Sequence, residues 1–234
     1  MKRGILFKLI SGLLIYAHVF WSAVVFAEIR RPAGIVYSLS GEAHVARGSE
    51  PNYSEALKFR DEVFYQDRIR TKEHSLVRVL LGGKAVLTIR ALSEVTITEQ
   101  PGGPSNVEIT SGKVSLGVAR SRMSPGEEIE IRTPNAVVAV RGTLLIVEVE
   151  PASTDQAPAT TTFSLLQGSA NVSVRGGSGG AVALGALQSV SVTGTSIGQV
   201  FEITPSQIGQ VLWGLTMPDV PGTLQEAQQT LTTP

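Results

Sequence analysis

Apolar and polar residues alternate with a period of two along most of the chain. Clear alternation runs through residues 35–47, 76–89, 95–98 and 189–193, which are rich in Val, Ile and Thr. A two-residue period places successive side chains on opposite faces of a β-strand, and β-branched residues favour strands. Gly82-Gly83 divides one of these runs and predicts a tight hairpin turn. The pattern predicts an all-β fold, a twisted two-sheet sandwich or roll of about ten to fourteen short strands.

Three glycines interrupt the alternation in the same way. Gly41, Gly112 and Gly168 are each followed by apolar residues two and four positions later. A glycine inside a strand pattern allows a sharp bend. The unequal spacing of the three glycines argues against a strict solenoid, which needs a fixed period. It favours instead a duplicated strand-bend-strand unit within a two-sheet structure.

Residues 132–143 form the most informative segment of the chain. Pro134 fixes the entry, and the unbroken apolar run 136–140 follows. A short Val-rich run bounded by punctuating residues is typical of a strand that is buried on both faces.

Arg141, beside Gly142, ends that apolar run. A buried guanidinium without a partner is costly, so the position predicts an internal clamp that pairs with an acid such as Asp67 or Glu148. The alternative is that Arg141 presents a bidentate donor to the carboxylate of a partner.

The string Thr-Pro-x-Ala-x-x-Ala-Val-Arg-Gly-Thr over residues 133–143 resembles the FecR domain, an extracytoplasmic all-β module of bacteria. Weaker pieces occur in the expected order: Gly34-x-Val36 with Gly41, Asp67-x-Ile69-x-Thr71, the hairpin 77–89, and Gly112-x-Val114. The resemblance covers roughly residues 34–195. The motif residues that we expect to be structural are Thr133, Pro134, Ala136, Val140, Arg141, Gly142, Thr143, Asp67 and Thr71.

The resemblance implies a module that acts by binding. In the best-known FecR proteins the domain follows a cytoplasmic anti-sigma segment and one transmembrane helix, and relays the state of an outer-membrane receptor. Here eight residues precede the apolar segment, so we do not expect the anti-sigma function. We expect a non-enzymatic module that binds an envelope or outer-membrane protein, with residues 100–106 and 151–161 as contact loops. The alternative is a domain that binds cell-wall glycan, peptidoglycan included.

Residues 1–27 have the pattern of a secretion signal. Lys2, Arg3 and Lys8 precede an apolar stretch that ends in Val25-Phe26-Ala27, with small residues at the positions that signal peptidase reads. We expect cleavage after Ala27 and a location in the periplasm, or secreted at the cell surface. The alternative is an uncleaved membrane anchor, because a stretch of about 19 mostly apolar residues can span a bilayer.

The C-terminal part changes from strand to helix. Thr204, Pro205 and Gln207 form a capping-box pattern, and an apolar helical face follows, made of Ile208, Val211, Leu212 and Leu215. We expect this helix to cover an edge or end of a sheet, with Trp213 as a packing residue. The predicted organisation is a signal peptide at 1–27, a FecR-like β domain at 28–203, a short helix at 204–216 and a disordered tail at 217–234.

Charge and cysteine content narrow the class of protein. The signal-like segment holds three basic and no acidic residues, so the rest of the chain carries three more acidic than basic side chains. Binding the phosphate backbone of a nucleic acid needs a domain with an excess of basic residues, and this chain has none. We therefore do not expect nucleic acid as a partner. The chain has no cysteine, which excludes disulfides and a lipid anchor on an N-terminal cysteine.

Motifs for catalysis or cofactor binding are not found in the sequence. It lacks Gly-x-Ser-x-Gly, His-Glu-x-x-His and a glycine-rich nucleotide loop. His44 and His74 could approach Glu42 or Glu73, but no pair has metal-ligand spacing. We therefore expect no catalytic residue, no metal and no cofactor.

Overall fold

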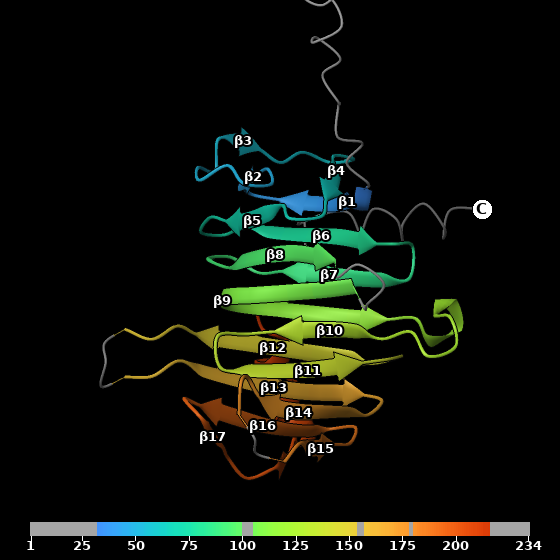
Figure 1. Cartoon of the computed structure of the whole chain (residues 1–234), viewed down its shortest axis with the longest axis vertical. Helices are drawn as coiled ribbons and strands as arrows, with labels where there is room; N and C mark the ends of the chain where they lie inside the picture. The colour runs from blue at the N-terminus through green and yellow to red at the C-terminus, as the bar shows by residue number, and fades with distance from the viewer. Residues whose placement is uncertain (1–31, 100–104, 154–156, 178–179, 216–234) are drawn as a thin grey trace, which may run out of the picture. The chain divides into compact units, whose positions relative to one another are not determined.

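Two β-sheets that share one hydrophobic core make up the fold (Figure 1). The structure is a computed structural model, and it describes residues 32–99, 105–153, 157–177 and 180–215. These residues belong to one compact unit. The predicted all-β class with two sheets is confirmed.

Each sheet has a simple strand order. Sheet A contains β4 (Glu62–Phe64), β1 (Pro32–Ser40), β6 (Leu76–Leu81), β7 (Ala85–Ile89), the second half of β9 (Ser105–Val118), β12 (Leu144–Glu150), β13 (Thr160–Gln167) and β16 (Gln188–Thr193), which pairs with β17 (Ser196–Ile197) and β18 (Phe201–Glu202). Sheet B contains β3 (Glu55–Ala56), β2 (Ala43–Ala46), β5 (Arg68–Thr71), β8 (Glu94–Glu99), the first half of β9, β10 (Ile129–Arg132), β11 (Ala136–Val140), β14 (Ala170–Val174) and β15 (Val182–Leu184). All of these pairs are antiparallel except β9 with β10.

Strand β9 crosses from one sheet to the other. Residues 105–111 pair with β8 in sheet B, and residues 112–118 pair with β7 and β12 in sheet A. The bend falls at Gly112, whose φ of +88° is in the left-handed region that favours glycine. A Cβ at this position would lie 2.6 Å from the Cα of Ser93, so the backbone of the neighbouring corner leaves no room for a side chain.

The other two glycines of the repeated pattern have the same role. Gly41 links β1 to β2 and Gly168 links β13 to β14, each from sheet A to sheet B, with φ of +75° and +95°. Each of the three glycines packs against a hydroxyl residue at an adjacent corner, namely Ser75, Ser93 and Thr143 respectively. The predicted strand-bend-strand unit is therefore confirmed, and it joins the two sheets.

The core between the sheets is rich in valine, and Phe163 is its largest fully buried side chain. The strand β11 differs from expectation. Ala136, Val138 and Val140 are buried, whereas Val137 and Ala139 are half-buried. The prediction of burial on both faces was wrong, because only one face of sheet B packs against the core.

The number of strands was also underestimated. The described residues contain eighteen strands. The excess comes mainly from strands of two or three residues, which are too short to show a period. The closely spaced strands β4 and β5, for example, lie in different sheets.

Short strands end the sheets. The outermost strands β3, β4, β15, β17 and β18 have two or three residues each. A short edge strand offers few free backbone groups to a strand of another chain. The ends of both sheets are therefore poor templates for strand addition.

The predicted C-terminal helix is present as α2 (Pro205–Leu212). It starts with the expected capping box between Thr204 and Gln207. The helix lies across the outer face of sheet A, however, where Lys113 Nζ of β9 donates to the carbonyl oxygen of Gln210 at 3.3 Å. The expectation that it covers an edge or end was wrong, since the fully buried Ile146 offers it an apolar surface on the face.

Two predicted segments, the signal peptide at 1–27 and the tail at 217–234, lie outside the described residues. Within the described ranges, no helix has both the length and the apolar character needed to cross a membrane.

Candidate functional site

The motif at residues 133–143 begins with a buried polar turn. The Thr133 hydroxyl accepts the N–H of Ala136 at 3.1 Å and donates to the carbonyl oxygen of the same residue at 3.2 Å. The Thr161 hydroxyl donates to Asn135 Oδ1 at 2.6 Å. Pro134 is exposed, and the other residues of the turn are buried. These bonds fix the geometry of the turn between β10 and β11.

Asn135 ties this turn to sheet A. Its Nδ2 donates to the carbonyl oxygens of Ala159 and Val192, each at 2.8 Å. Asn135 was not among the residues predicted from the sequence. A usable signal was present, because Asn beside Pro favours a turn and a buried amide must find hydrogen-bond partners.

The end of the motif is a sheet-to-sheet corner. Gly142 has φ +70°, and it connects β11 in sheet B to β12 in sheet A. His74, Leu92 and Leu187 have the same left-handed conformation at three other connections between the sheets. Thr143 is buried, and a Cβ added to Gly168 would lie 2.8 Å from its Cγ2. Gly142 and Thr143 therefore serve the fold.

Arg141 is not the predicted buried clamp. Its side chain is exposed, and its Nη2 donates to the carbonyl oxygen of Ser124 at 3.4 Å. The two acids proposed as its partners bond elsewhere: Asp67 with Arg47, and Glu148 with Lys113. Because the Arg141 side chain is exposed to solvent, its charge needs no internal neutralisation.

The guanidinium that pairs with a buried carboxylate is that of Arg47 instead. Its Nη1 donates to Asp67 Oδ2 at 2.5 Å and to the carbonyl oxygen of Glu62 at 3.0 Å. Its Nε and Nη2 donate to the two carboxylate oxygens of Glu55, each at 2.8 Å. The side chain of Asp67 is fully buried, and that of Arg47 is 15% exposed. The buried Asp67 therefore pairs with Arg47 and not with Arg141.

These contacts shift the protonation equilibria of the pair. The hydrogen bonds that Arg47 donates to Glu55, followed by its contact with Asp67, raise the pKa of Arg47 against the opposing effect of burial. In turn, the hydrogen bond from Arg47 lowers the pKa of Glu55 below its ordinary value of 4.5. Both groups are therefore charged at neutral pH.

The lowered pKa predicts a pH dependence of stability. Glu55 stabilises the fold above pH 4.5, and this contribution is lost as the pH falls through the lowered folded-state pKa. In Glu55→Gln the loss of stability between pH 6 and pH 3 is expected to be smaller than in the unmodified chain. Urea unfolding at both pH values measures the difference, with the exposed Glu150→Gln as a control. An equal change in the free energy of unfolding between pH 6 and pH 3 in all three proteins would show that Glu55 is not the source of the pH dependence.

Thr71, another motif residue, is also buried. Its hydroxyl donates to the carbonyl oxygen of Arg90 at 2.5 Å and accepts the N–H of Ser93 at 3.0 Å. It therefore holds the corner 90–93 between β7 and β8, which carries the side chains of Arg90 and Leu92.

An exposed patch lies at this corner. Trp213, which follows α2, is 69% exposed, and its ring lies 5.0 Å from Arg90 Cζ. Leu92 is 62% exposed and has φ +56°, and His74 at the neighbouring corner has φ +53°. Together with adjoining residues they line a hollow of about 610 Å³. We call Trp213, Arg90, Leu92 and His74 the Trp213 patch; the expectation that Trp213 is a packing residue was wrong.

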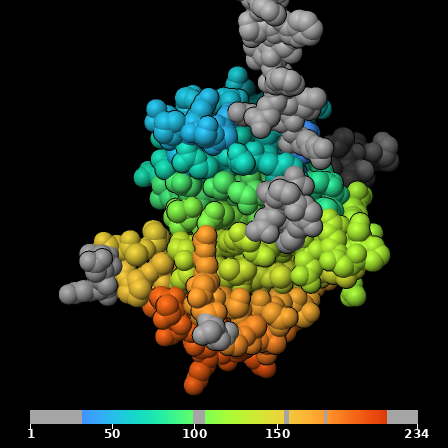
Figure 2. All heavy atoms as spheres, viewed as in Figure 1, coloured from blue at the N-terminus to red at the C-terminus, as the bar shows by residue number. Residues whose placement is uncertain are grey.

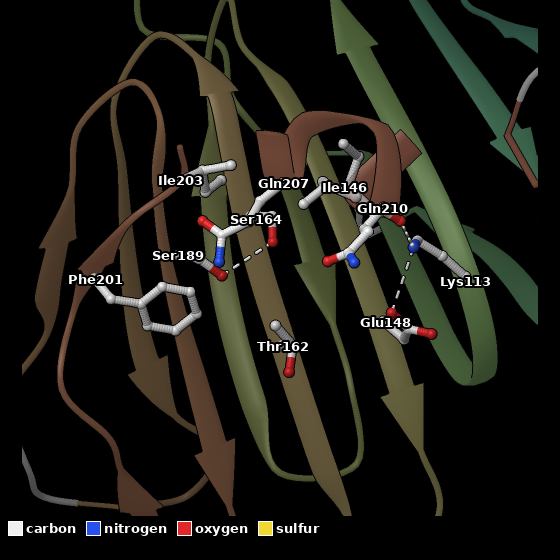
Figure 3. A pocket seen from close by; sticks show the side chains of 11 residues that line it. Lys113, Ile146, Glu148, Thr162, Ser164, Ser189, Phe201, Ile203, Gln207 and Gln210 are labelled. Atoms are coloured by element: carbon white, nitrogen blue, oxygen red, sulfur yellow. Dashed lines mark hydrogen bonds and ion pairs between the residues drawn. The ribbon is translucent and has the colours of Figure 1, made fainter. Parts of the chain in front are cut away.

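A second hollow lies between α2 and sheet A (Figure 3). It has a volume of about 240 Å³. Lys113 and Glu148 form an ion pair at 3.4 Å on its floor, and Phe201 lies at one end. We call this hollow the α2 groove; the further residues that line it are Ile146, Thr162, Ser164, Ser189, Ile203, Gln207, Gln210 and Val211.

Polar contacts on sheet B involve one of the histidines and a tyrosine. His44 Nε2 lies 3.3 Å from Glu42 Oε1. On the outer face of sheet B, Arg70 lies over the ring of Tyr53 at 4.0 Å, and burial, with Glu94 nearby, raises the pKa of Tyr53 to about 12. Among the residues that the structure describes, no group of three or more His, Cys, Asp or Glu side chains is placed to hold a metal ion.

Comparison with known proteins gives one family. Residues 67–171 match the model of the family described as FecR protein. The match lies inside the segment 34–195 expected from the motifs, and it covers the middle of the sandwich, from β5 to β14. A search of curated proteins finds no match.

Two solved structures are similar to the chain. Both are crystal structures of a candidate anti-sigma factor from Parabacteroides distasonis ATCC 8503, at 2.50 and 1.65 Å resolution. Each is 19% identical with a TM-score of 0.49, and 63% of this chain is covered. The chain spans 64% and 65% of the length of those proteins, less than two thirds.

Proposed function

Because the chain carries a FecR domain, matched over residues 67–171, we propose that it is a non-enzymatic module of the bacterial envelope that binds another envelope protein through the Trp213 patch. The domain match supports a role related to signalling. The export pattern of residues 1–27 supports a location outside the cytoplasm. The proposal of a protein partner is argued from the exposed residues of the structure.

The exposed Trp213 carries this proposal. Trp and Arg are the residues most enriched at positions that dominate binding energy, and such residues cluster around a hollow that a partner side chain can fill. The patch joins Trp213 and Arg90 in one stacked pair, next to the exposed Leu92. An isolated exposed apolar residue is ordinary, but two large ones bordering a hollow of about 610 Å³ form a contiguous surface.

Backbone geometry at the patch supports the same conclusion. Leu92 holds a left-handed φ that costs a non-glycine residue about 1 kcal/mol or more. The buried Thr71 hydroxyl bonds Arg90 and Ser93 on both sides of it and maintains this conformation. The corner therefore presents Leu92 to solvent in a fixed position.

The charge around the patch indicates the chemistry of the partner. Arg90 stacks on Trp213, and Arg78 Nη2 donates to the carbonyl oxygen of Leu215 at 3.5 Å. Among the described residues that line the hollow, Glu73 is the one acid. A partner segment with an apolar anchor flanked by acidic side chains is complementary to this rim.

The other surfaces considered fit this role less well. Binding through a sheet edge is disfavoured by the short outermost strands. The β12–β13 hairpin, which carries the expected contact loop 151–161, projects beyond its neighbours (Figure 2). Residues 159–161 of that loop are nevertheless tied into the fold by Asn135 and β13, and residues 100–104 and 154–156 lie outside the described residues.

Replacement of Trp213 tests the proposal. In affinity purification from envelope extracts with the full chain, Trp213→Ala and Leu92→Ser are each expected to reduce recovery of a specific protein at least about tenfold. Phe59→Ala and Leu187→Ser are matched controls, because Phe59 is another largely exposed aromatic and Leu187 occupies an equivalent left-handed corner. Equal recovery by all four variants would overturn the proposed function.

A further inference from the structure

The α2 groove has a wall of polar groups that the fold does not use fully. The side-chain amide of Gln210 faces the groove (Figure 3) and makes no hydrogen bond to any described residue. Gln207 uses its Oε1 for the capping box, at 2.9 Å from the N–H of Thr204, which leaves its Nε2 as a free donor toward the groove. Two amides from one face of α2 are therefore available to a ligand.

The floor of the groove adds a neutral pair of charges. Lys113 is only 5% exposed, and its Nζ lies 3.4 Å from Glu148 Oε2 and 3.3 Å from the carbonyl oxygen of Gln210. Both contacts are long for charge-assisted hydrogen bonds, which are commonly about 2.7–2.9 Å. The ammonium group can donate a further hydrogen bond, and the half-exposed carboxylate can accept one. Because the two charges cancel, the groove favours an uncharged, polar ligand.

The remaining lining combines hydroxyls with an aromatic ring. Thr162, Ser164 and Ser189 come from adjacent strands of sheet A, and the Ser164 and Ser189 hydroxyls lie 2.9 Å apart. Phe201 of β18, at one end of the groove, is 49% exposed although it is a large apolar side chain. A surface with amides and hydroxyls along one side and a free aromatic face at one end suits a ligand with a polar rim and an apolar face.

We propose that the α2 groove binds one ring of an uncharged cell-wall saccharide, of the N-acetylhexosamine class. A pyranose ring has hydroxyls around its edge and C–H groups on its faces, so it can bond the amides with its edge while one face lies on Phe201. An acetamido group offers one donor and one acceptor, which is the complement of a primary amide such as that of Gln210. The volume of about 240 Å³ is below the ~300–1,000 Å³ typical of sites for drug-sized ligands and is suited to a single ring.

This site is independent of the proposed protein partner. It lies on the outer face of sheet A, and none of its lining residues belongs to the Trp213 patch. The two sites together describe a module that holds a protein at one surface and the wall at another.

Calorimetric titration of the full chain tests the groove. The titrant is the soluble β-1,4-linked tetramer of N-acetylglucosamine, with the glucose tetramer and a cell-wall stem tetrapeptide for comparison. We expect binding of the N-acetylglucosamine tetramer, weakened on the order of tenfold by Gln210→Ala and by Phe201→Ala. The matched controls Gln167→Ala and Phe59→Ala, also exposed, are expected to change the Kd less than twofold.

Several results would overturn the inference. They are no binding of the N-acetylglucosamine tetramer, equal weakening by groove and control variants, and binding of the stem tetrapeptide in its place. All variants alter exposed side chains, and circular dichroism establishes that each is folded. Recovery of the protein partner is expected to be unchanged in Gln210→Ala, so failure of this inference leaves the proposed function standing.

Discussion

Replacement of Arg47 by methionine is expected to lower the free energy of unfolding by about 3–5 kcal/mol. The change leaves the carboxylate of Asp67 fully buried, with the N–H of Phe64 at 2.8 Å as its remaining partner. Loss of the contact with Asp67 accounts for most of this cost. Loss of the contact with Glu55 contributes little, because Glu55 is half-exposed and well solvated. Urea unfolding followed by circular dichroism measures the loss.

Arg141→Met is the matched control for this variant. Arg141 is exposed and makes a single long hydrogen bond, so its replacement is expected to change stability by no more than about 0.5 kcal/mol. Equal effects at the two positions would show that Arg47 is not the buried clamp of this fold. A large effect at position 141 alone would contradict the placement of both side chains.

Gly112→Ala is expected to destabilise the fold by about 3 kcal/mol or more. The left-handed backbone costs an alanine about 1–2 kcal/mol, and the new Cβ would overlap the backbone of Ser93, which must move. Ser93 accepts the N–H of Lys113 and lies beside the corner that carries Leu92, so movement here disturbs both sheets. Thermal unfolding of the purified variant measures the effect.

Gly83→Ala separates the two causes. Gly83 also has a left-handed φ of +70°, but no atom lies within 4 Å of an added Cβ. Its replacement is therefore expected to cost only the backbone term, about 1–2 kcal/mol. If the two variants lose the same stability, close packing at the crossing of β9 is not what requires glycine at position 112.

Local patterns in the sequence were sufficient for most of the architecture. The paired Gly82 and Gly83, the capping box at Thr204 and the three bend glycines each depend on backbone geometry that few residues can adopt. The structure places all of them as predicted. The strand count failed where strands have two or three residues, because so short a segment cannot display a period.

The arginine that neutralises the buried Asp67 could not be predicted in the same way. Arg47 and Asp67 lie 20 residues apart in sequence and meet only when β2 pairs with β5. Asp67 belongs to a motif, but Arg47 has no local pattern that separates it from the other charged residues that flank strands. Arg141 was selected because it ends an apolar run, but that run leads into a solvent-exposed corner.

The error at Trp213 was avoidable. The apolar helical face consists of residues 208, 211, 212 and 215, and position 213 falls off it by the same helical period. The neighbours of Trp213 in sequence suggested packing, whereas the period predicted exposure. The α2 groove, by contrast, gathers side chains from five strands and a helix, so no sequence spacing could reveal it.

The motif that resembles the FecR family therefore builds the fold, and the proposed function places binding on other residues. Thr133, Gly142 and Thr143 form turns and corners, and Thr71 supports the loop that presents Leu92. Replacements within the motif are expected to act through stability, whereas replacements in the Trp213 patch are expected to act on binding alone.

Site-specific photo-crosslinking in living cells tests the assigned binding surface most directly. A photoreactive phenylalanine analogue replaces either Leu92, in the Trp213 patch, or Leu187, an exposed residue at an equivalent corner elsewhere. The account predicts one discrete protein adduct from position 92, lost when Trp213 is also changed to alanine, and no adduct from position 187. An adduct from position 187 alone, or one from position 92 that persists without Trp213, would contradict it.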